Sequence, residues 1–404
     1  MVAPQAVRDI AGVVGVLLVL TAYSSVIGTL IVPRSVTNWL TRKVDQLVRL
    51  AFLLVTKPML TPGTKLAESD GSRPDVAQAA ALSFVIQRYR TRDRVESAYA
   101  PALILAQLIA WLGIFFVGFA LIFWPLVPGG ITAAFHTAGP ALWEIGTDQA
   151  RGALQQTILD IAAITGIITV TLQIAYLPTL YSAFNRREQE VALLNARAGV
   201  PSWGPELLAR THYALGSGVS TIDTLPDLYE SWERWAADVA ESHTTYLPLV
   251  RFRSPRPLSS WATALLAVLD SAALILVLAP SQAPTVAARL CLRSGFLCFN
   301  EVARAMRFAI PEEPDPSRGI SLTYEEFLDA IARMRSVDFP VERSAEEAWP
   351  DFVGWRVNYE QAAYAIADEI DAVPALWSGP RRGRICPQIP PFRPPEGRVK
   401  KKAG

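Results

Sequence analysis

Three uncharged, apolar runs constrain the fold of this chain more than any other feature. They cover residues 10–32, 100–127 and 161–183. Each contains the roughly 20 apolar residues that a helix needs to cross the hydrocarbon core of a bilayer. Of the 404 residues, 51% are hydrophobic and only 19% are charged, an unusual balance for a soluble protein. The runs predict an all-α membrane protein with three transmembrane helices.

The first run follows Arg8, as the apolar core of a signal peptide would. It is longer than a typical signal core and lacks a clear small-x-small cleavage site, so we expect it to remain as an anchor.

Basic residues are distributed unevenly around these runs. Eleven Lys or Arg lie between the first and second runs, whereas Arg151 is alone between the second and third, and Arg186 and Arg187 directly follow the third. Under the positive-inside rule, the N-terminus is outside and the C-terminal half is cytoplasmic. We therefore expect a multi-pass protein of the plasma (inner) membrane.

A fourth apolar stretch, residues 258–279, has two interpretations. Asp270 lies at its middle, where an acid in a bilayer costs about 2.5–3.5 kcal/mol on insertion scales. Basic residues flank both ends, so the orientation signals cancel. We favour the buried central helix of a soluble bundle, with a fourth span as the alternative.

The segment 128–152 is too long and too apolar for a solvated hairpin between spans. Backbone of this kind enters a membrane only where protein or a water-filled cavity satisfies its polar groups. We expect a short helix over residues 132–142, then an extended "EIGTD" (Glu144 to Asp148), together forming a re-entrant pore loop. The C-terminal end of a half-helix offers partial negative charge to a cation, and Gly146 allows carbonyls to turn toward an axis. One loop cannot enclose an ion, so the chain should form a homo-oligomer, most simply a homotetramer.

The order of span, pore loop and span resembles the two-span pore module of potassium channels. More narrowly, the chain resembles bacterial, chiefly actinobacterial, membrane proteins described as potassium-channel-like or two-pore-domain-like. The matching stretches are "GTLIVPR" (28–34), "YRTRDRV" (89–95), "LQIAYLPTLYSAFNRREQEV" (172–191), "RAGVPSWGPELLAR" (197–210) and "WERWAADVAESHTTYLPLVRFRSPRP" (232–257).

The resemblance implies a selectivity filter, and there the chain departs from the pattern. Potassium filters carry Thr-Val-Gly-Tyr-Gly, whereas the aligned residues here are Glu144, Ile145, Gly146, Thr147 and Asp148, preceded by Trp143. Acids replace the Thr and the second Gly, and the aromatic residue is lost. A ring of carboxylates is typical of cation pores and would hold a monovalent or divalent cation. The loop is either an altered cation filter or a degenerate loop that no longer conducts, and potassium selectivity is not predicted.

Two positions in the third run are candidate gating residues. Gly166 is either a hinge or a close-packing glycine, and Pro178 should kink the helix near its inner end. A polar side of this helix either lines a wet cavity, which we favour slightly, or hydrogen-bonds to neighbouring helices. It consists of Thr165, Thr169, Thr171 and Gln173.

Outside the spans, we expect helices and one disordered tail. Residues 38–59 have an amphipathic pattern and would lie on anionic lipid or pack on the cytoplasmic domain. A helical domain should follow, with its core on one face of a helix that carries Leu228, Trp232, Trp235 and Val239, and with capping boxes at 323–326 and 344–347. The basic, proline-rich tail should bind anionic lipid or an acidic partner, or be solvated only.

The predicted organisation is 1–33 (anchor), 34–99 (cytoplasmic segment), 100–185 (pore module), 186–378 (helical domain) and 379–404 (tail).

Catalytic and metal-binding patterns are missing from the sequence. The three His residues share no close spacing, and the three Cys residues form no C-x-x-C pair. Cys291 and Cys298 are seven residues apart and should be buried thiols. We expect no enzyme activity, no metal site and no nucleic-acid partner. The two remaining function classes are an oligomeric cation channel controlled by its cytoplasmic domain, and a non-conducting membrane-anchored scaffold or sensor with a degenerate pore module.

Overall fold

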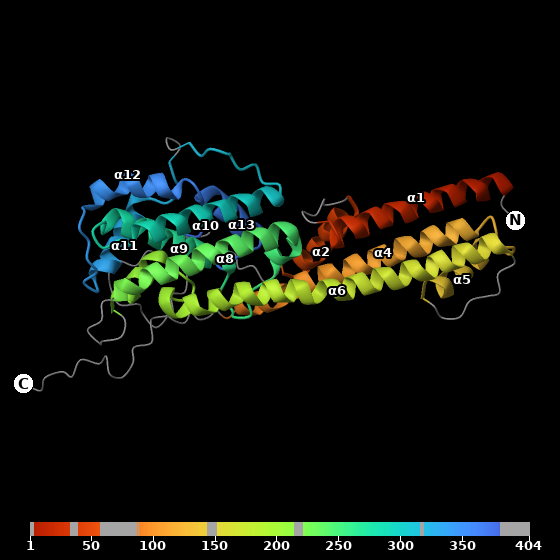
Figure 1. Ribbon diagram of the computed structural model, residues 1–404, viewed down its shortest axis with the longest axis horizontal. Helices are drawn as coiled ribbons and strands as arrows, with labels where there is room; N and C mark the ends of the chain where they lie inside the picture. The colour runs from red at the N-terminus through yellow and green to blue at the C-terminus, as the bar shows by residue number, and fades with distance from the viewer. Residues whose placement is uncertain are drawn as a thin grey trace, which may run out of the picture. The chain divides into compact units, whose positions relative to one another are not determined.

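The computed structural model describes residues 4–32, 39–56, 87, 89–143, 152–213, 221–315 and 319–379, and these ranges contain helices and connecting turns but no strand (Figure 1). The chain divides into two compact units. Unit 1 comprises Met1–Lys57 and Ala98–Ser182, and unit 2 comprises Pro58–Ser97 and Ala183–Gly404. Four helices are long and apolar enough to cross a membrane, so the coarse prediction of an all-α protein with several such helices is confirmed.

Unit 1 contains the three predicted apolar runs as long helices. Its elements are α1 (Gln5–Leu30), α2 (Trp39–Thr56), α4 (Tyr99–Phe123), α5 (Gly130–Trp143) and the first part of α6 (Ala153–Ala198). α2 occupies the predicted amphipathic segment, and α5 occupies the predicted short helix at 132–142. α6, the helix that contains the third run, is longer than that run. It continues past Pro178 for 20 residues into unit 2.

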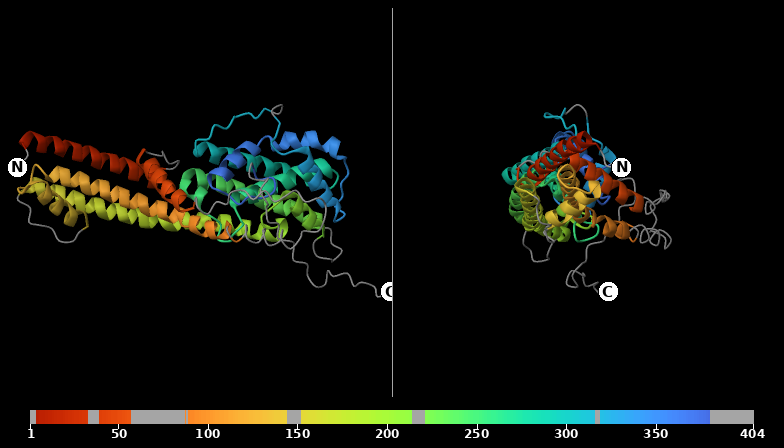
Figure 2. Two further views of the ribbon diagram at one scale, coloured as in Figure 1. Left: turned by 180° about the vertical axis from the view of Figure 1, so that it is seen from behind. Right: turned by 90° about the vertical axis from the view of Figure 1, so that its right-hand side faces the viewer.

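Small residues allow α1 and α4 to lie side by side (Figures 1 and 2). A Cβ atom at Gly15 would lie 2.5 Å from the carbonyl oxygen of Gly118, so neither backbone leaves room for a side chain. Close approach of this kind is typical of packed apolar helices. The Trp111 indole donates a hydrogen bond to Ser25 Oγ at 3.0 Å, which satisfies the polar atom that α4 buries against α1.

Unit 2 is a helical domain built around α9 (Trp261–Leu278). The surrounding elements are α7 (Gly204–Tyr213), η2 (Thr221–Thr224), α8 (Leu225–Thr245), η3 (Leu247–Arg251), α10 (Thr285–Ala305), α11 (Tyr324–Arg335), α12 (Ala345–Arg356) and α13 (Glu360–Glu369). Every residue of α9 except Leu276 is buried, and α7, α8, α10, α12 and α13 all pack on it. The predicted central helix is buried among its neighbours, and the choice between a soluble bundle and a fourth span stays a prediction.

Local sequence signals account for much of unit 2. Both predicted capping boxes form, with Thr323 and Ser344 as the N-cap residues of α11 and α12. Trp232 and Trp235 are buried on one face of α8 with ring centroids 4.5 Å apart, as predicted. Cys291 and Cys298 are buried free thiols, also as predicted. Apart from Gly379, the predicted tail lies outside the described residues.

Candidate functional site

The hairpin formed by α4, α5 and α6 is the candidate pore site. α5 begins seven residues after the end of α4 and packs back along it. The rings of Phe116 on α4 and Phe135 on α5 have centroids 5.2 Å apart, and a Cβ atom at Gly139 would lie 3.5 Å from the Phe116 ring. α5 therefore runs from the end of α4 back into unit 1 (Figure 1).

The C-terminal end of α5 lies against α6 near the start of the apolar run 161–183. A Cβ atom at Gly166 would lie only 2.1 Å from the carbonyl oxygen of Leu142, so this position admits nothing larger than hydrogen. Gly166 is 13 residues beyond the first residue of α6, about 20 Å along the helix axis at 1.5 Å per residue. This contact with α5 is what the close-packing alternative predicts, and the gating role of Gly166 stays a prediction.

The other predicted pore residues have different outcomes. Trp143 is the last residue of α5, and 51% of its surface is exposed. Glu144, Ile145, Gly146, Thr147 and Asp148 lie outside the described residues, so the filter prediction stays a prediction. Pro178 lies inside α6, which continues to Ala198, and the kink predicted at this proline stays a prediction.

The polar side of α6 is mostly turned into the protein. Thr165 and Thr169 are fully buried, and their hydroxyls donate to carbonyls one turn earlier on α6, while Thr165 also contacts the Tyr23 hydroxyl of α1. For these two residues the structure favours bonding to neighbouring groups over the wet cavity that the sequence suggested. Gln173 is buried too, and its Oε1 has no hydrogen-bond partner among the described residues.

Arg187 is the centre of a buried network in the part of α6 that belongs to unit 2. Its side chain is fully buried and donates to the carbonyl oxygens of Leu249 (2.8 Å) and Phe252 (2.6 Å), at the end of η3. The Glu188 carboxylate lies 2.7 Å from the guanidinium and balances its charge. A buried guanidinium with all these partners fixes the 249–252 segment to α6.

His243 on α8 completes this network as a neutral ring. Its Nε2 lies 3.0 Å from Arg187 Nη1, and its Nδ1 lies 3.0 Å from Ser242 Oγ. A guanidinium only donates, so Nε2 must accept and the ring proton must be on Nδ1. Burial and then the charge of Arg187 hold the pKa of His243 well below its ordinary value, which keeps the ring neutral.

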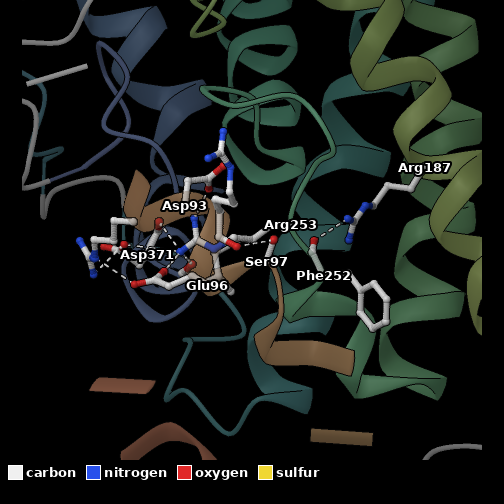
Figure 3. A network of polar contacts seen from close by, with 10 residues as sticks. Asp93, Glu96, Ser97, Arg187, Phe252, Arg253 and Asp371 are labelled. Carbon is white, nitrogen blue, oxygen red and sulfur yellow. Dashed lines mark hydrogen bonds and ion pairs between the residues drawn. The ribbon is translucent and has the colours of Figure 1, made fainter. Parts of the chain in front are cut away.

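Arg253 forms a second network directly after the first (Figure 3). Its guanidinium donates to Asp93 at 2.7 Å, to Glu96, and to the carbonyl oxygens of Ile370 (3.1 Å) and Asp371 (3.2 Å). Burial raises the pKa of Asp93 and of Glu96, and the charge of Arg253 opposes that rise. Arg92 adds a second cation, with its Nη2 2.8 Å from the Asp371 carboxylate.

The two networks meet at adjacent residues. The Phe252 carbonyl accepts from Arg187 of α6, and the Arg253 side chain holds Asp93 and Glu96, which lie in a helical segment at 89–96 only a few residues before α4 begins. Residues 252–253 therefore bind both the segment that leads into α4 and the segment that follows the apolar part of α6 (Figure 3). We call residues 249–253 the bridging segment.

Sequence reasoning used Arg187 and Arg253 only as topology signals and missed their partners Asp93, Glu96 and Asp371. These partners are separated from Arg253 by more than one hundred residues along the chain, so no local spacing indicates them. Residue type and local sequence give no signal that would have paired Asp93 with Arg253.

A third buried network holds the middle of α9. Asp270 accepts from Arg356 Nη1 at 2.5 Å and from the Tyr359 hydroxyl at 2.8 Å. Arg356 also donates to Glu360 at 2.7 Å and to the Trp377 carbonyl at 2.7 Å. The acid that made this stretch a poor transmembrane candidate is thus paired inside unit 2.

Within the described ranges, no group of three or more His, Cys, Asp or Glu residues is arranged to hold a metal ion. Comparisons with protein-family models, curated proteins and solved structures give no match to this chain.

Proposed function

We propose that unit 1 is the membrane part of a multi-pass inner-membrane protein, with α1, α4 and α6 as its three spans. The support is the small fraction of each helix that is buried in protein. In the most apolar 18-residue stretch of each helix, 28%, 39% and 33% of the residues are buried, against 94% in α9. The exposed residues of the first three are largely aliphatic, as lipid contact requires. α9 already has a protein environment and needs none from lipid.

We further propose that unit 1 forms the pore of an oligomeric cation channel or channel-like protein, most simply a homotetramer. The observation that carries this is the position of α5, whose C-terminal end lies about 20 Å along α6 from the start of that helix. In the proposed bilayer, the partially negative end of this short helix would lie about 8 Å inside the start of the apolar run 161–183, where a cation is stabilised. The acidic segment that follows, Glu144 to Asp148, would then line the axis between subunits.

The bridging segment supports control of this pore by unit 2. A pore opens when its lining helices move relative to one another, and both α4 and α6 are continued by segments that Arg253 and Arg187 hold. A displacement of residues 249–253 would therefore act on both helices. The proposed topology has the N-terminus outside and unit 2 in the cytoplasm.

A non-conducting scaffold or sensor is the second candidate. It is favoured by the acids at the Thr and second Gly positions of the filter pattern. The charged networks of unit 2 are complete within that unit, so unit 2 does not need a conducting pore to be ordered.

Reconstitution into liposomes loaded with a cation-sensitive dye, and into planar bilayers, separates the two. Conduction predicts cation flux that Glu144→Gln changes in selectivity or block by divalent cations, whereas Glu241→Gln, a change of the same chemistry on unit 2, leaves flux unaltered. Native mass spectrometry in detergent should show a tetramer. A strict monomer, or an absence of flux under all ionic conditions, would refute the channel and leave the scaffold.

A further inference from the structure

Helix α2 has two different apolar faces, and only one of them is packed against protein. Leu40 and Val44 are buried in the core of unit 1, where α2 lies against α4. A second stripe is exposed to the extent of 64% for Trp39, 66% for Leu47 and 66% for Leu54. Large aliphatic and aromatic side chains on an exposed stripe need an apolar environment from outside this chain's fold.

The contacts of α2 fix its depth relative to the proposed spans. The Thr41 hydroxyl lies 3.3 Å from that of Thr29, in the last turn of α1. The Tyr99 hydroxyl, at the first residue of α4, donates to Asp45 at 2.8 Å. α2 therefore lies where α1 ends and α4 begins, which is the boundary of the proposed bilayer on the side of unit 2.

The exposed side of α2 next to this stripe is mixed, with Arg42, Gln46 and Arg49 beside Leu53 (47% exposed) and Val55 (53% exposed). At 100° per residue, Arg42 and Arg49 lie on one flank of the exposed apolar stripe, whereas Gln46 lies only about 20° from Trp39. Lys43 lies within the stripe, and its four-carbon stem allows the ammonium group to extend to the headgroups. Apolar side chains beside cations, at the end of a span, match the acyl-chain boundary and the anionic headgroups of one leaflet.

We infer that α2 is an interfacial helix that binds the anionic leaflet on the side of unit 2. Trp39, Leu47, Leu50 and Leu54 enter the acyl-chain boundary, and Arg42 and Lys43 contact lipid phosphates. This inference rests on the proposed membrane insertion of α1 and α4, but not on conduction.

Nitroxide depth measurements on the full-length protein test it. The protein is reconstituted in bilayers of phosphatidylglycerol and phosphatidylcholine, with Cys386 replaced by Ser because the other two cysteines are buried. Labels at positions 47 and 54 should collide with oxygen more than with an aqueous nickel chelate, whereas a label at position 49, on the basic flank, should show the reverse. A label at Leu17, exposed at the middle of α1, is the reference for membrane insertion.

Each outcome is decisive. A deep label at position 17 with aqueous labels at 47 and 54 overturns the lipid-binding α2. So does low accessibility of 47 and 54 to both reagents, since that would show another protein surface covering the stripe. An aqueous label at position 17 would instead refute the membrane insertion on which the inference rests.

The headgroup component has its own test, by native mass spectrometry of the protein released from the same bilayers. The double variant Arg42→Gln/Lys43→Gln should lower the ratio of retained phosphatidylglycerol to phosphatidylcholine by about 25-fold, which is about fivefold for each of the two cations removed from an anionic surface. Arg289→Gln/Arg293→Gln, an exposed pair on α10 of unit 2, should leave the ratio unchanged. An unchanged ratio in the α2 variant, or an equal fall in both, contradicts the assignment.

Discussion

α1 and α9 are both long apolar helices, yet they differ in how much of each is buried in protein. In the most apolar stretch of α1, 28% of the residues are buried, and in that of α9, 94%. The polar groups differ as well. Thr21 of α1 bonds to its own helix and Ser25 accepts from Trp111, whereas Asp270 of α9 binds Arg356, 86 residues away in the sequence. An apolar sequence shows only that a helix is unfavourable in water. The partners of its polar residues indicate whether protein or lipid surrounds it instead.

Arg356→Met is expected to have the largest effect, because it leaves Asp270 as an uncompensated buried charge. Loss of one partner of a buried ion pair costs about 3–5 kcal/mol. Tryptophan fluorescence during denaturant unfolding in detergent would measure it for unit 2. Arg343→Met, which breaks a more exposed pair with Asp351, should cost less than about 1 kcal/mol. Similar losses in the two variants would mean that the α9 acid does not depend on its partner.

Arg187→Met should destabilise unit 2 by about 2–4 kcal/mol, since it leaves two buried carbonyls and Glu188 without their donor. The adjacent Arg186 provides a matched comparison, because its side chain is 55% exposed and pairs with Asp238 at the surface. Arg186→Met should change stability by less than about 1 kcal/mol. The same unfolding assay reports both, and equal effects would show that the bridging segment is not fixed by Arg187.

Gly166→Ala tests the packing of unit 1. The new methyl group would lie 2.1 Å from the Leu142 carbonyl, so α5 or α6 must move, at a cost of about 1–3 kcal/mol. Gly113→Ala on α4 meets no atom within 4 Å and should be neutral or stabilising. Thermal unfolding in detergent measures both changes. If Gly166→Ala is as well tolerated as Gly113→Ala, α5 does not end against α6.

Acidification should destabilise unit 2 through His243, with the smallest effect of the four. The folded-state pKa of His243 is lowered by burial and by Arg187, so the unfolded chain binds a proton that the folded chain does not. Stability from this group is complete above the ordinary pKa near 6.5 and is lost as the pH falls below it, by about 1.4 kcal/mol per pH unit. Unfolding at pH 7.5 and 5.5 should reveal the loss. His243→Gln, which keeps an acceptor for Arg187, should reduce it, whereas the exposed His212→Gln should not.

The sequence was informative where local chemistry decides the structure. The uncharged runs, the short helix after the second run and both capping boxes follow from residue type and spacing within one or two turns, and all were predicted. The acid at the middle of α9 indicated a buried helix because its cost in lipid is known. These features need no knowledge of which distant segments meet.

The networks could not be predicted, since they depend on long-range contacts. Nothing in the sequence distinguishes Arg187, Arg253 and Arg356 from arginines on the surface. Only the fold brings Leu249, Asp93 and Asp270 to them. The sequence left two alternatives for Gly166, because a glycine within a helix is compatible both with a hinge and with close packing against a neighbouring helix. The orientation of Thr165 and Thr169 likewise depends on neighbouring helices that the pattern does not specify.

α6 is one continuous helix of 46 residues that contains both Gly166 and Arg187. The two positions are 21 residues apart, about 32 Å along the axis of an ideal helix, and Pro178 lies between them. Because a proline lacks the backbone N–H, Pro178 removes one hydrogen bond of the helix between the residue that contacts Leu142 and the arginine that holds residues 249–252.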